Sequence, residues 1–492
     1  MRREIQSGLA LAFFAAASLV GCNGEEMEPT QVVSDDAAIA DLIDEARRHA
    51  QRGNLRQSGL VYDQALEIDE NSPRIWVDVA RLRYSGGEQI QALAAADRAL
   101  VNGPDFPPAL TLKGQLVRDA FGFSTALAWF ERAADLAAED PSILTDLAAT
   151  LGDMGRHRDM LRFADRAAKG GQEQAQVQFL YAVLAARASE PTLASGLLPS
   201  DDYSDGSRPA AVILRGIIDL QQGSHDAAAD AFEELLKLQP SNIRARELLA
   251  HAMWEGGRDR EIVDRFGTEV LERQSSFYLT NIVARAYERM GDRERAIAIL
   301  THSLRADNAT ELRILSIDGP LPQTTAKVRA MLNRGDLSGA RAYTISLRKR
   351  FPGSSDVLVL AGDTALANSD YENAISEYFE AARIRRTWPL VQKMIYALEQ
   401  LGDEEAANAL LVDFVKGEPR NADALSALAR RAVHVGDWER SAQLLDSAMA
   451  IGGESAPSMV ALRFATAKAL GRDSDRWGAT ARQVWPGSFV DQ

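Results

Sequence analysis

The sequence has one cysteine, Cys22, among 492 residues, so no internal disulfide can form. Aromatic residues are also scarce, at 7% against 46% for all hydrophobic types. A core with so few large rings must be built mainly from Ala and Leu. This composition is typical of closely packed helices.

The chain has fewer basic than acidic residues. The chain has 55 Lys and Arg against 70 Asp and Glu, which gives a formal net charge of -15 and a pI of about 5.1. Binding to nucleic-acid phosphates needs a positive surface, so we do not expect nucleic acid as a partner. The acidic balance itself indicates solubility rather than a particular ligand.

Residue patterns for catalysis are missing as well. The sequence contains no His-Glu-x-x-His motif and no Gly-x-Ser-x-Gly turn. The segment 201–206 departs from a calcium loop, because Tyr203 and Val212 stand where carboxylates belong. We therefore expect no enzymatic activity, no metal and no cofactor. The histidines are scattered, with no pair at metal-ligand spacing: His49, His157, His225, His251, His302 and His434.

The first residues have the pattern of an export signal. Met1-Arg2-Arg3 is followed by an apolar run over residues 9–20, which is too short to span a bilayer comfortably. Leu19-Val20-Gly21-Cys22 resembles the bacterial lipobox, and this resemblance implies a lipid on Cys22 after removal of residues 1–21. The alternative is an ordinary secretory signal that leaves a free thiol.

Residues 22–36 then form an acidic stretch without helical periodicity, which we interpret as a lipidated, flexible tether. About fourteen extended residues reach up to about 45 Å. Asn23 is not the Asp that retains enteric lipoproteins at the inner membrane. That resemblance favours the periplasmic face of the outer membrane of a bacterial cell envelope, and the choice between inner and outer membrane stays open.

Glycines recur with a period of 34 residues. Gly53 and Gly87 are 34 apart, and the phase continues to Gly291, which lies seven periods after Gly53. Gly is suited to the turn after a helix because it tolerates unusual backbone angles. Small residues precede each turn by seven positions, which predicts close helix contacts there: Ala46, Ala80, Gly114, Ala148, Ala182, Gly216, Ala250 and Ala284.

The stretch from Ser355 to Arg386 contains one complete unit of this kind. Its key positions match the tetratricopeptide repeat family, which it resembles: Gly362, Asp370, Ala374, Tyr378 and Ala381. The resemblance implies an all-α fold, a right-handed α-solenoid of about a dozen helix-turn-helix repeats.

The phase divides this solenoid into two arrays. Gly291 and Gly335 are 44 residues apart, so ten extra residues interrupt the repeats. We predict an N-terminal array over residues 37–314, an insertion over 315–323, and a C-terminal array over 324–492. A capping helix within the last segment, which carries Trp477 and Trp485, is expected to cover the end of the stack.

In this family, the first helix of each repeat lines a concave groove. The resemblance therefore assigns partner binding to these groove positions: Arg81, Tyr84, Arg187, Trp254, Tyr278, Asn281, Arg285, Arg289, Arg329 and Arg430, with Arg118, Phe179, His251 and Tyr396 at equivalent positions. Arginine binds carboxylates through paired N–H groups, and flat rings stack on sugars or apolar side chains. The alternative is that these arginines pair with neighbouring acids in a solvated groove.

Two further expectations concern particular surfaces. We predict the main binding surface around Trp254, Tyr278, Asn281, Arg285 and Arg289. A second basic cluster, which includes Arg383, Arg385 and Arg386, falls at helix ends, where cations meet the helix dipole favourably, and we expect it to face outward.

These features favour a non-enzymatic, lipid-anchored scaffold that binds envelope proteins through its groove. By architecture it resembles the repeat lipoproteins of exopolysaccharide secretion and of exosortase-linked sorting. The alternative is a glycan-binding lipoprotein that contacts an acidic polysaccharide or peptidoglycan.

Overall fold

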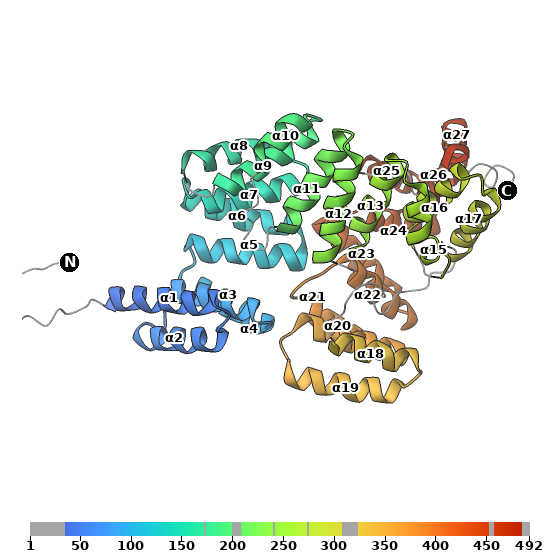
Figure 1. The fold of residues 1–492 in the computed structure, drawn as a ribbon. Coiled ribbons are helices and arrows are strands. Elements are labelled where there is room, and N and C mark those ends of the chain that lie inside the picture. The colour runs from blue at the N-terminus through green and yellow to red at the C-terminus, as the bar shows by residue number, and fades with distance from the viewer. Residues whose placement is uncertain are drawn as a thin grey trace, which may run out of the picture.

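The computed structural model describes residues 35–171, 174–198, 208–239, 242–272, 275–307, 323–451 and 457–484. These ranges contain 27 helices and no strand, which confirms the all-α solenoid (Figure 1). None of the helices in them is long and apolar enough to cross a membrane. Cys22, the tether, most of the insertion and Trp485 lie outside the described residues.

The helices form thirteen consecutive pairs, and the short α15 adds one turn to the seventh pair. The first array comprises α1 (Asp35–Gln51), α2 (Leu55–Ile68), α3 (Pro73–Ser85), α4 (Gln89–Asn102), α5 (Pro107–Phe121), α6 (Phe123–Leu136), α7 (Pro141–Asp153), α8 (His157–Lys169), α9 (Gln174–Arg187), α10 (Pro191–Leu197), α11 (Arg208–Gln221), α12 (His225–Leu238), α13 (Ile243–Glu255), α14 (Asp259–Phe266), α15 (Glu269–Glu272), α16 (Phe277–Arg289) and α17 (Arg293–Asp307).

The second array follows the insertion. It comprises α18 (Gln323–Asn333), α19 (Leu337–Arg350), α20 (Ser355–Ala367), α21 (Tyr371–Ala382), α22 (Trp388–Gln400), α23 (Glu404–Gly417), α24 (Ala422–His434), α25 (Trp438–Ala450), α26 (Pro457–Leu470) and α27 (Ser474–Val484).

The turns within the pairs explain the 34-residue phase. At the first turn, Gly53 has φ 77°, and the N–H of Asn54 donates to the carbonyl of His49 at 2.9 Å. This bond satisfies a carbonyl that the helix end would otherwise leave unpaired. At two turns the position that glycine occupies elsewhere is taken by serine. Ser189 and Ser369 adopt the same left-handed conformation there, with φ 59° and 56°.

Close packing within each pair depends on the predicted small residues. Ala46, Ala80 and Ala148 are buried. A Cβ added to Gly114 would lie 2.9 Å from the ring of Phe130 on the following helix, so that ring occupies the space a side chain would need. The apolar core runs as adjoining clusters between the helices of successive repeats.

A polar network is buried in the second array. The Nζ of Lys393 on α22 lies 2.7 Å and 2.8 Å from the two carboxylate oxygens of Asp363 on α20, and the Tyr378 hydroxyl on α21 donates to Asp363 at 2.7 Å. Asp363 is 3% and Lys393 8% exposed. Burial raises the pKa of Asp363 to about 6, against the opposing effects of Lys393 and Tyr378. The network fixes three successive helices to one another.

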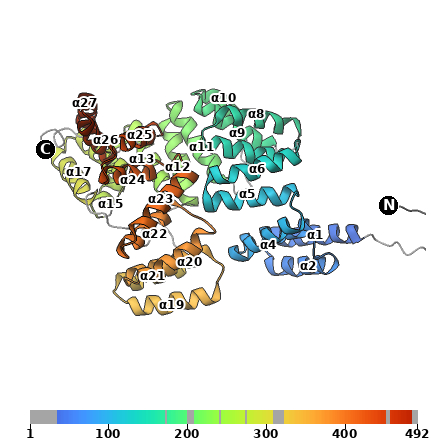
Figure 2. The ribbon, with the colours of Figure 1, turned by 180° about the vertical axis from the view of Figure 1, so that it is seen from behind.

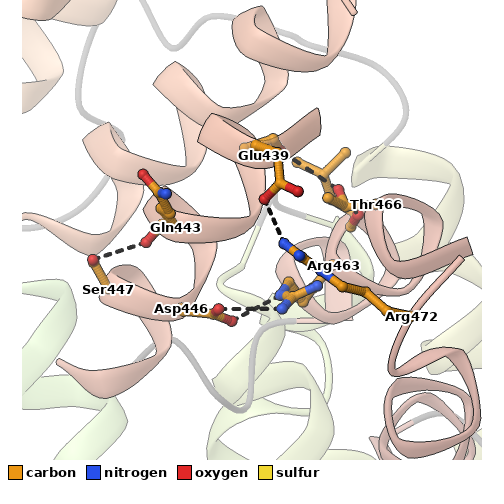
Figure 3. Close-up of polar contacts among 9 residues, drawn as sticks. Glu439, Gln443, Asp446, Ser447, Arg463, Thr466 and Arg472 are labelled. Carbon is orange, nitrogen blue, oxygen red and sulfur yellow. Dashed lines mark hydrogen bonds and ion pairs between the residues drawn. The ribbon is translucent and has the colours of Figure 1, made fainter. Parts of the chain in front are cut away.

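The last segment is a helix pair, α26 and α27, rather than one capping helix. Trp477 is 8% exposed, and the Arg463 guanidinium lies 4.8 Å from its ring centroid. Arg463 also binds both oxygens of Asp446 on α25, at 2.7 Å and 3.1 Å, and Arg472 pairs with Glu439 (Figure 3). These ion pairs attach the final helix pair to the stack.

The two arrays meet along a line of contacts between α3–α8 and α20–α24 (Figure 1, Figure 2). The Gln89 N–H donates to the Gly353 carbonyl at 3.1 Å, and the Gln89 side-chain oxygen accepts from the Ser355 N–H at 2.8 Å. We call this contact the seam. It comprises Gln89, Ile90, Asp119, Phe121, Gly122, Asp153 and Gly155 of the first array, and Gly353, Ser355, Arg386, Gly417, Glu418 and Arg420 of the second.

The seam corrects the expectation that Arg386 faces outward. Its side chain is only 9% exposed and pairs with Asp413 at 2.6 Å. The guanidinium lies 5.6 Å from the ring of Phe121 and 5.9 Å from that of Phe414, and the Arg386 N–H donates to the Asp119 carbonyl at 2.9 Å. Stacking between rings of the two arrays, rather than a helix dipole, accounts for this arginine.

Candidate partner-binding face

A cavity opens among the first helices of repeats one to four. It has a volume of about 370 Å³, and we call it the N-terminal pocket. The predicted residue Arg81 lines it, together with two arginines that were not among the predicted residues, Arg47 and Arg74. Apolar and small polar side chains complete its lining: Val77, Phe106, Pro108, Thr111, Ser142 and Ile143, with Asp78 and Asp140.

One carboxylate organises the charge of the N-terminal pocket. Asp78 is 5% exposed and accepts from the Arg47 guanidinium at 2.8 Å. Arg81 approaches Asp78 only to 3.8 Å, too far for a hydrogen bond, and its side chain is 50% exposed. Arg74 has no ion pair within the described residues. Two guanidinium groups therefore face the pocket with spare hydrogen-bond donors.

The carboxylate of Asp140 does not neutralise these donors through direct contact. It caps α7, where one of its oxygens accepts from the N–H groups of Ser142 at 2.9 Å and Ile143 at 3.3 Å. Such a cap satisfies helix N–H groups that have no partner within the helix. The pocket holds three arginines against two aspartates, so it carries a local positive excess in a chain of net charge -15.

A second group of predicted residues gathers on α13 and α16, and we call it the aromatic cluster. The His251 ring centroid lies 6.3 Å from that of Trp254 and 6.2 Å from that of Tyr278. The Tyr278 hydroxyl lies 3.0 Å from Nδ1 of His251. Burial lowers the pKa of His251, so the neutral imidazole can accept this hydroxyl proton at Nδ1.

The arginines of this cluster are used in different ways. The Arg289 guanidinium lies 4.3 Å from the Trp254 ring centroid and donates to the Trp254 carbonyl at 2.9 Å, so it links α16 to α13. Arg285 is half exposed and reaches only Glu288, at 3.7 Å. Arg285 is therefore available to a ligand, whereas Arg289 holds the scaffold together. The Nε1 atom of Trp254 is buried without a hydrogen-bond partner among the described residues.

Models of a known repeat family match three parts of the chain. Two tetratricopeptide repeat models match, one over residues 213–261 and 325–389 and the other over residues 281–313. The chain is a tetratricopeptide repeat (TPR) protein. No curated protein sequence matches this TPR protein.

Three solved structures with a similar fold are distant from this chain in sequence. A Pseudomonas aeruginosa PilF structure shares 20% identity, covers 44% of this TPR chain and 99% of its own, and has a TM-score of 0.36. Human IFIT1 shares 16%, with coverage of 71% and 84% and a TM-score of 0.38. Yeast Tom70 shares 13%, with coverage of 92% and 86% and a TM-score of 0.28. At these scores none of them bears on what this TPR protein binds.

The remaining predicted residues of the TPR groove lie apart from both groups. Tyr84 donates to Asp119 at 3.0 Å and packs against the α20–α22 core, so it belongs beside the seam. Arg187 lies 3.2 Å from the His157 ring nitrogen. Arg430 lines a separate cavity of about 590 Å³ over α22–α25. Arg329 is in α18, and its side chain lies outside the described residues.

No group of three or more metal-binding side chains comes together in the part of the chain that the structure describes. The TPR register could have revealed Arg47, because it occupies the same helix position in the first repeat as Arg81 does in the second, 34 residues later. The same register could have revealed Arg74, the second residue of α3, because it lies six 34-residue periods before the predicted residue Tyr278.

Proposed function

We propose that this TPR protein is a non-enzymatic scaffold that binds an acidic segment of a partner protein in the N-terminal pocket. TPR folds serve protein–protein interaction, and this is the class of function that the repeats support. The observation that carries the proposal is the pair of guanidinium groups of Arg74 and Arg81, which line a cavity and have no carboxylate at hydrogen-bond distance among the described residues. Guanidinium groups bind carboxylates through paired N–H donors.

A synthetic peptide tests this chemistry directly. We expect a fluorescent decapeptide of alternating Glu and Leu to bind, and one of alternating Lys and Leu not to bind, in a fluorescence anisotropy titration at low salt. Changing both Arg74 and Arg81 to Glu should weaken binding by about tenfold or more, equivalent to about 1.4 kcal/mol. Arg56→Glu, on the opposite helix of the first repeat, is the matched control. Equal binding by the double variant and the control would overturn the assignment.

We also propose that the scaffold is attached to a bacterial cell envelope by a lipid on Cys22. The support is the sequence Leu19-Val20-Gly21-Cys22 after a charged and apolar leader. Two or more acyl chains make such attachment stable. The location would be the periplasmic face of the outer membrane, and exopolysaccharide secretion or exosortase-linked sorting would be its setting. Cys22→Ser should move the protein from the membrane fraction to the soluble fraction, and retention after a high-salt wash would contradict the lipid anchor.

A second candidate function is glycan binding at the aromatic cluster. Trp254 and Tyr278 provide flat surfaces for sugar rings, and half-exposed Arg285 provides a donor for a uronic acid. A photoreactive residue at position 278 should then recover carbohydrate from cells. Recovery of a single protein would instead favour the scaffold, and Arg285→Glu would decide whether this surface takes part in the capture.

A further inference from the structure

The seam follows the repeat period in both arrays. The turn between α3 and α4 meets the loop before α20, the end of α5 meets the loop before α22, and the turn between α7 and α8 meets the loop before α24. Three successive turns therefore meet three successive loops. The solenoid has wound back on itself, and one edge of repeats two to four lies against the opposite edge of repeats ten to twelve.

Backbone touches backbone at the centre of the seam. A Cβ added to Gly122 would lie 2.5 Å from the Gly417 carbonyl oxygen, and one added to Gly417 would overlap the Phe121 carbonyl oxygen. Gly122 has φ 86° and ψ 172°, a conformation open essentially to glycine alone. Since neither glycine has a side chain to hold the two arrays apart at this point, the contact depends on both.

The seam also lies next to the N-terminal pocket. Tyr84 is three residues, or about one helical turn, beyond Arg81 on α3, and it donates to Asp119. The Asp119 carbonyl in turn accepts from the Arg386 N–H. A partner segment that leaves the pocket along the C-terminal ends of α3 and α5 therefore meets the loop before α22. The second array occupies part of the path that a longer ligand would follow.

The fully buried cores of the two arrays are separate. Each array has its own closed apolar clusters, and the core of α20–α22 meets the first array through only partly buried side chains, Tyr84, Ile90 and Leu93. Contacts of this limited kind open at a lower free energy than the cores they join. Besides burial, the Asp153 carboxylate of the first array raises the pKa of Glu418 in the second, and this like-charge repulsion opposes closure of the seam.

We propose that the seam is a gate, and that a partner segment must part the two arrays in order to run from the N-terminal pocket along the concave face. The existence of the gate does not depend on the proposed function. Only the identity of the segment that passes through it rests on that function. Opening and partner binding are thermodynamically coupled, so a ligand that binds the open form shifts the equilibrium toward it.

Hydrogen exchange tests the gate without any ligand. The amides of Gln89, Ile90 and Arg386 donate across the seam, so their exchange reports its opening. We expect them to exchange with a lower free energy than amides in the middle of α5 and α20. If all of these amides exchange only with global unfolding, the two arrays form one cooperative unit and the gate is excluded.

A matched pair of glycine substitutions gives an independent measure. Gly417→Ala introduces a better helix former at the end of α23 but places a Cβ on the Phe121 carbonyl, so it should force the seam open. Gly59→Ala, in α2, meets only Leu82 at 3.9 Å and is the control. Spin labels at Val101→Cys and Val435→Cys, both highly exposed sites, should move apart in Gly417→Ala alone. An unchanged label distance in a folded Gly417→Ala protein would overturn the proposal.

A disulfide can hold the gate shut. Gln89→Cys and Gly353→Cys lie on residues joined by a backbone hydrogen bond across the seam, and Gln91→Ala removes the side chain that a Cβ at position 353 would overlap. In a Cys22→Ser background the oxidised protein should bind the Glu-Leu decapeptide with an association rate about tenfold lower than the reduced protein. Equal rates would refute the gate. If neither form binds the peptide, the proposed ligand is wrong, and the exchange and label measurements still decide whether the seam opens.

Discussion

Each array contains a buried aspartate, Asp78 in the first and Asp363 in the second, and the two differ in how fully their oxygens are paired. Asp363 is enclosed by Lys393 and Tyr378, which together supply three contacts of 2.7–2.8 Å to its oxygens. Asp78 accepts one close guanidinium contact, from Arg47, and has Arg81 at 3.8 Å beside an open cavity. The first carboxylate is satisfied internally and locks three helices together. The second leaves cationic donors in excess, which is the condition for binding an acid from outside.

The largest expected effect comes from breaking the closed site. Lys393→Met removes the cation from a fully buried carboxylate, and such a loss typically costs about 3–5 kcal/mol. We expect the second array to lose this much stability in urea unfolding followed by exchange or fluorescence. The double variant Asp363→Leu with Lys393→Met should recover most of it, because no unpaired charge is left. A single variant as stable as the parent would show that the network does not hold the helices.

Gly362 gives the next largest effect and concerns the packing beside the same site. A Cβ at Gly362 would overlap the ring of Tyr378, whose hydroxyl binds Asp363. Overpacking of this kind typically costs about 1–3 kcal/mol. Gly362→Ala should therefore lower the thermal unfolding temperature, whereas Gly59→Ala should leave it unchanged or raise it slightly. Equal behaviour of the two variants would mean that the Tyr378 ring moves aside without loss.

A third prediction concerns the pH dependence of the stability of the seam, which does not involve Asp78 or Asp363. Burial, followed by the nearby Asp153, raises the pKa of Glu418 from its ordinary 4.5 to about 7, while Arg386 opposes the rise. Because the folded pKa lies above the unfolded one, the folded state binds more protons between these values. The stabilisation is complete below about pH 4.5 and is lost as the pH rises through about 7.

Exchange at the seam amides should therefore become faster between pH 6 and 8, after correction for intrinsic rates. Glu418→Gln should remove this dependence, since it cannot ionise. Burial raises the pKa of Asp153 while Arg118 and Arg187 lower it, and Arg386 lowers that of Glu418. Arg187 also acts on His157, together with Arg420. A pH response that survives Glu418→Gln would assign it to Asp153 or His157, since arginine stays charged throughout this range, and His157 is the first to replace.

Local chemistry makes most of the fold predictable. Left-handed turns need glycine or a tolerant residue, so their 34-residue phase marks the helix pairs in the amino-acid sequence itself. An irregular turn carries a further signal: Gly122 stands 35 rather than 34 residues after Gly87, and it contacts the second array. Periodicity alone could not reveal the seam, because its partners are more than 260 residues apart and nothing local encodes their pairing.

The candidate site was predictable only in part for a related reason. Arg289 occupies a groove position, yet its guanidinium is taken up by Trp254 in the preceding repeat. Whether an arginine is free depends on neighbours one repeat away and on the rotamer it adopts. The composition of a groove can be inferred from register, but the donors that remain available to a ligand follow from contacts between repeats.

The smallest expected effect on stability is that of replacing Arg74, which lines the pocket beside Asp78. Arg74 has no ion pair within the described residues and is exposed, so Arg74→Ala should change the free energy of unfolding by less than about 0.5 kcal/mol. Its effect on binding of the Glu-Leu decapeptide should be larger than its effect on stability, because an acidic ligand would be its first close partner. Measuring both quantities on one variant distinguishes the two kinds of site. A residue whose replacement costs binding but not stability is held ready for a ligand, whereas Lys393 should show the reverse.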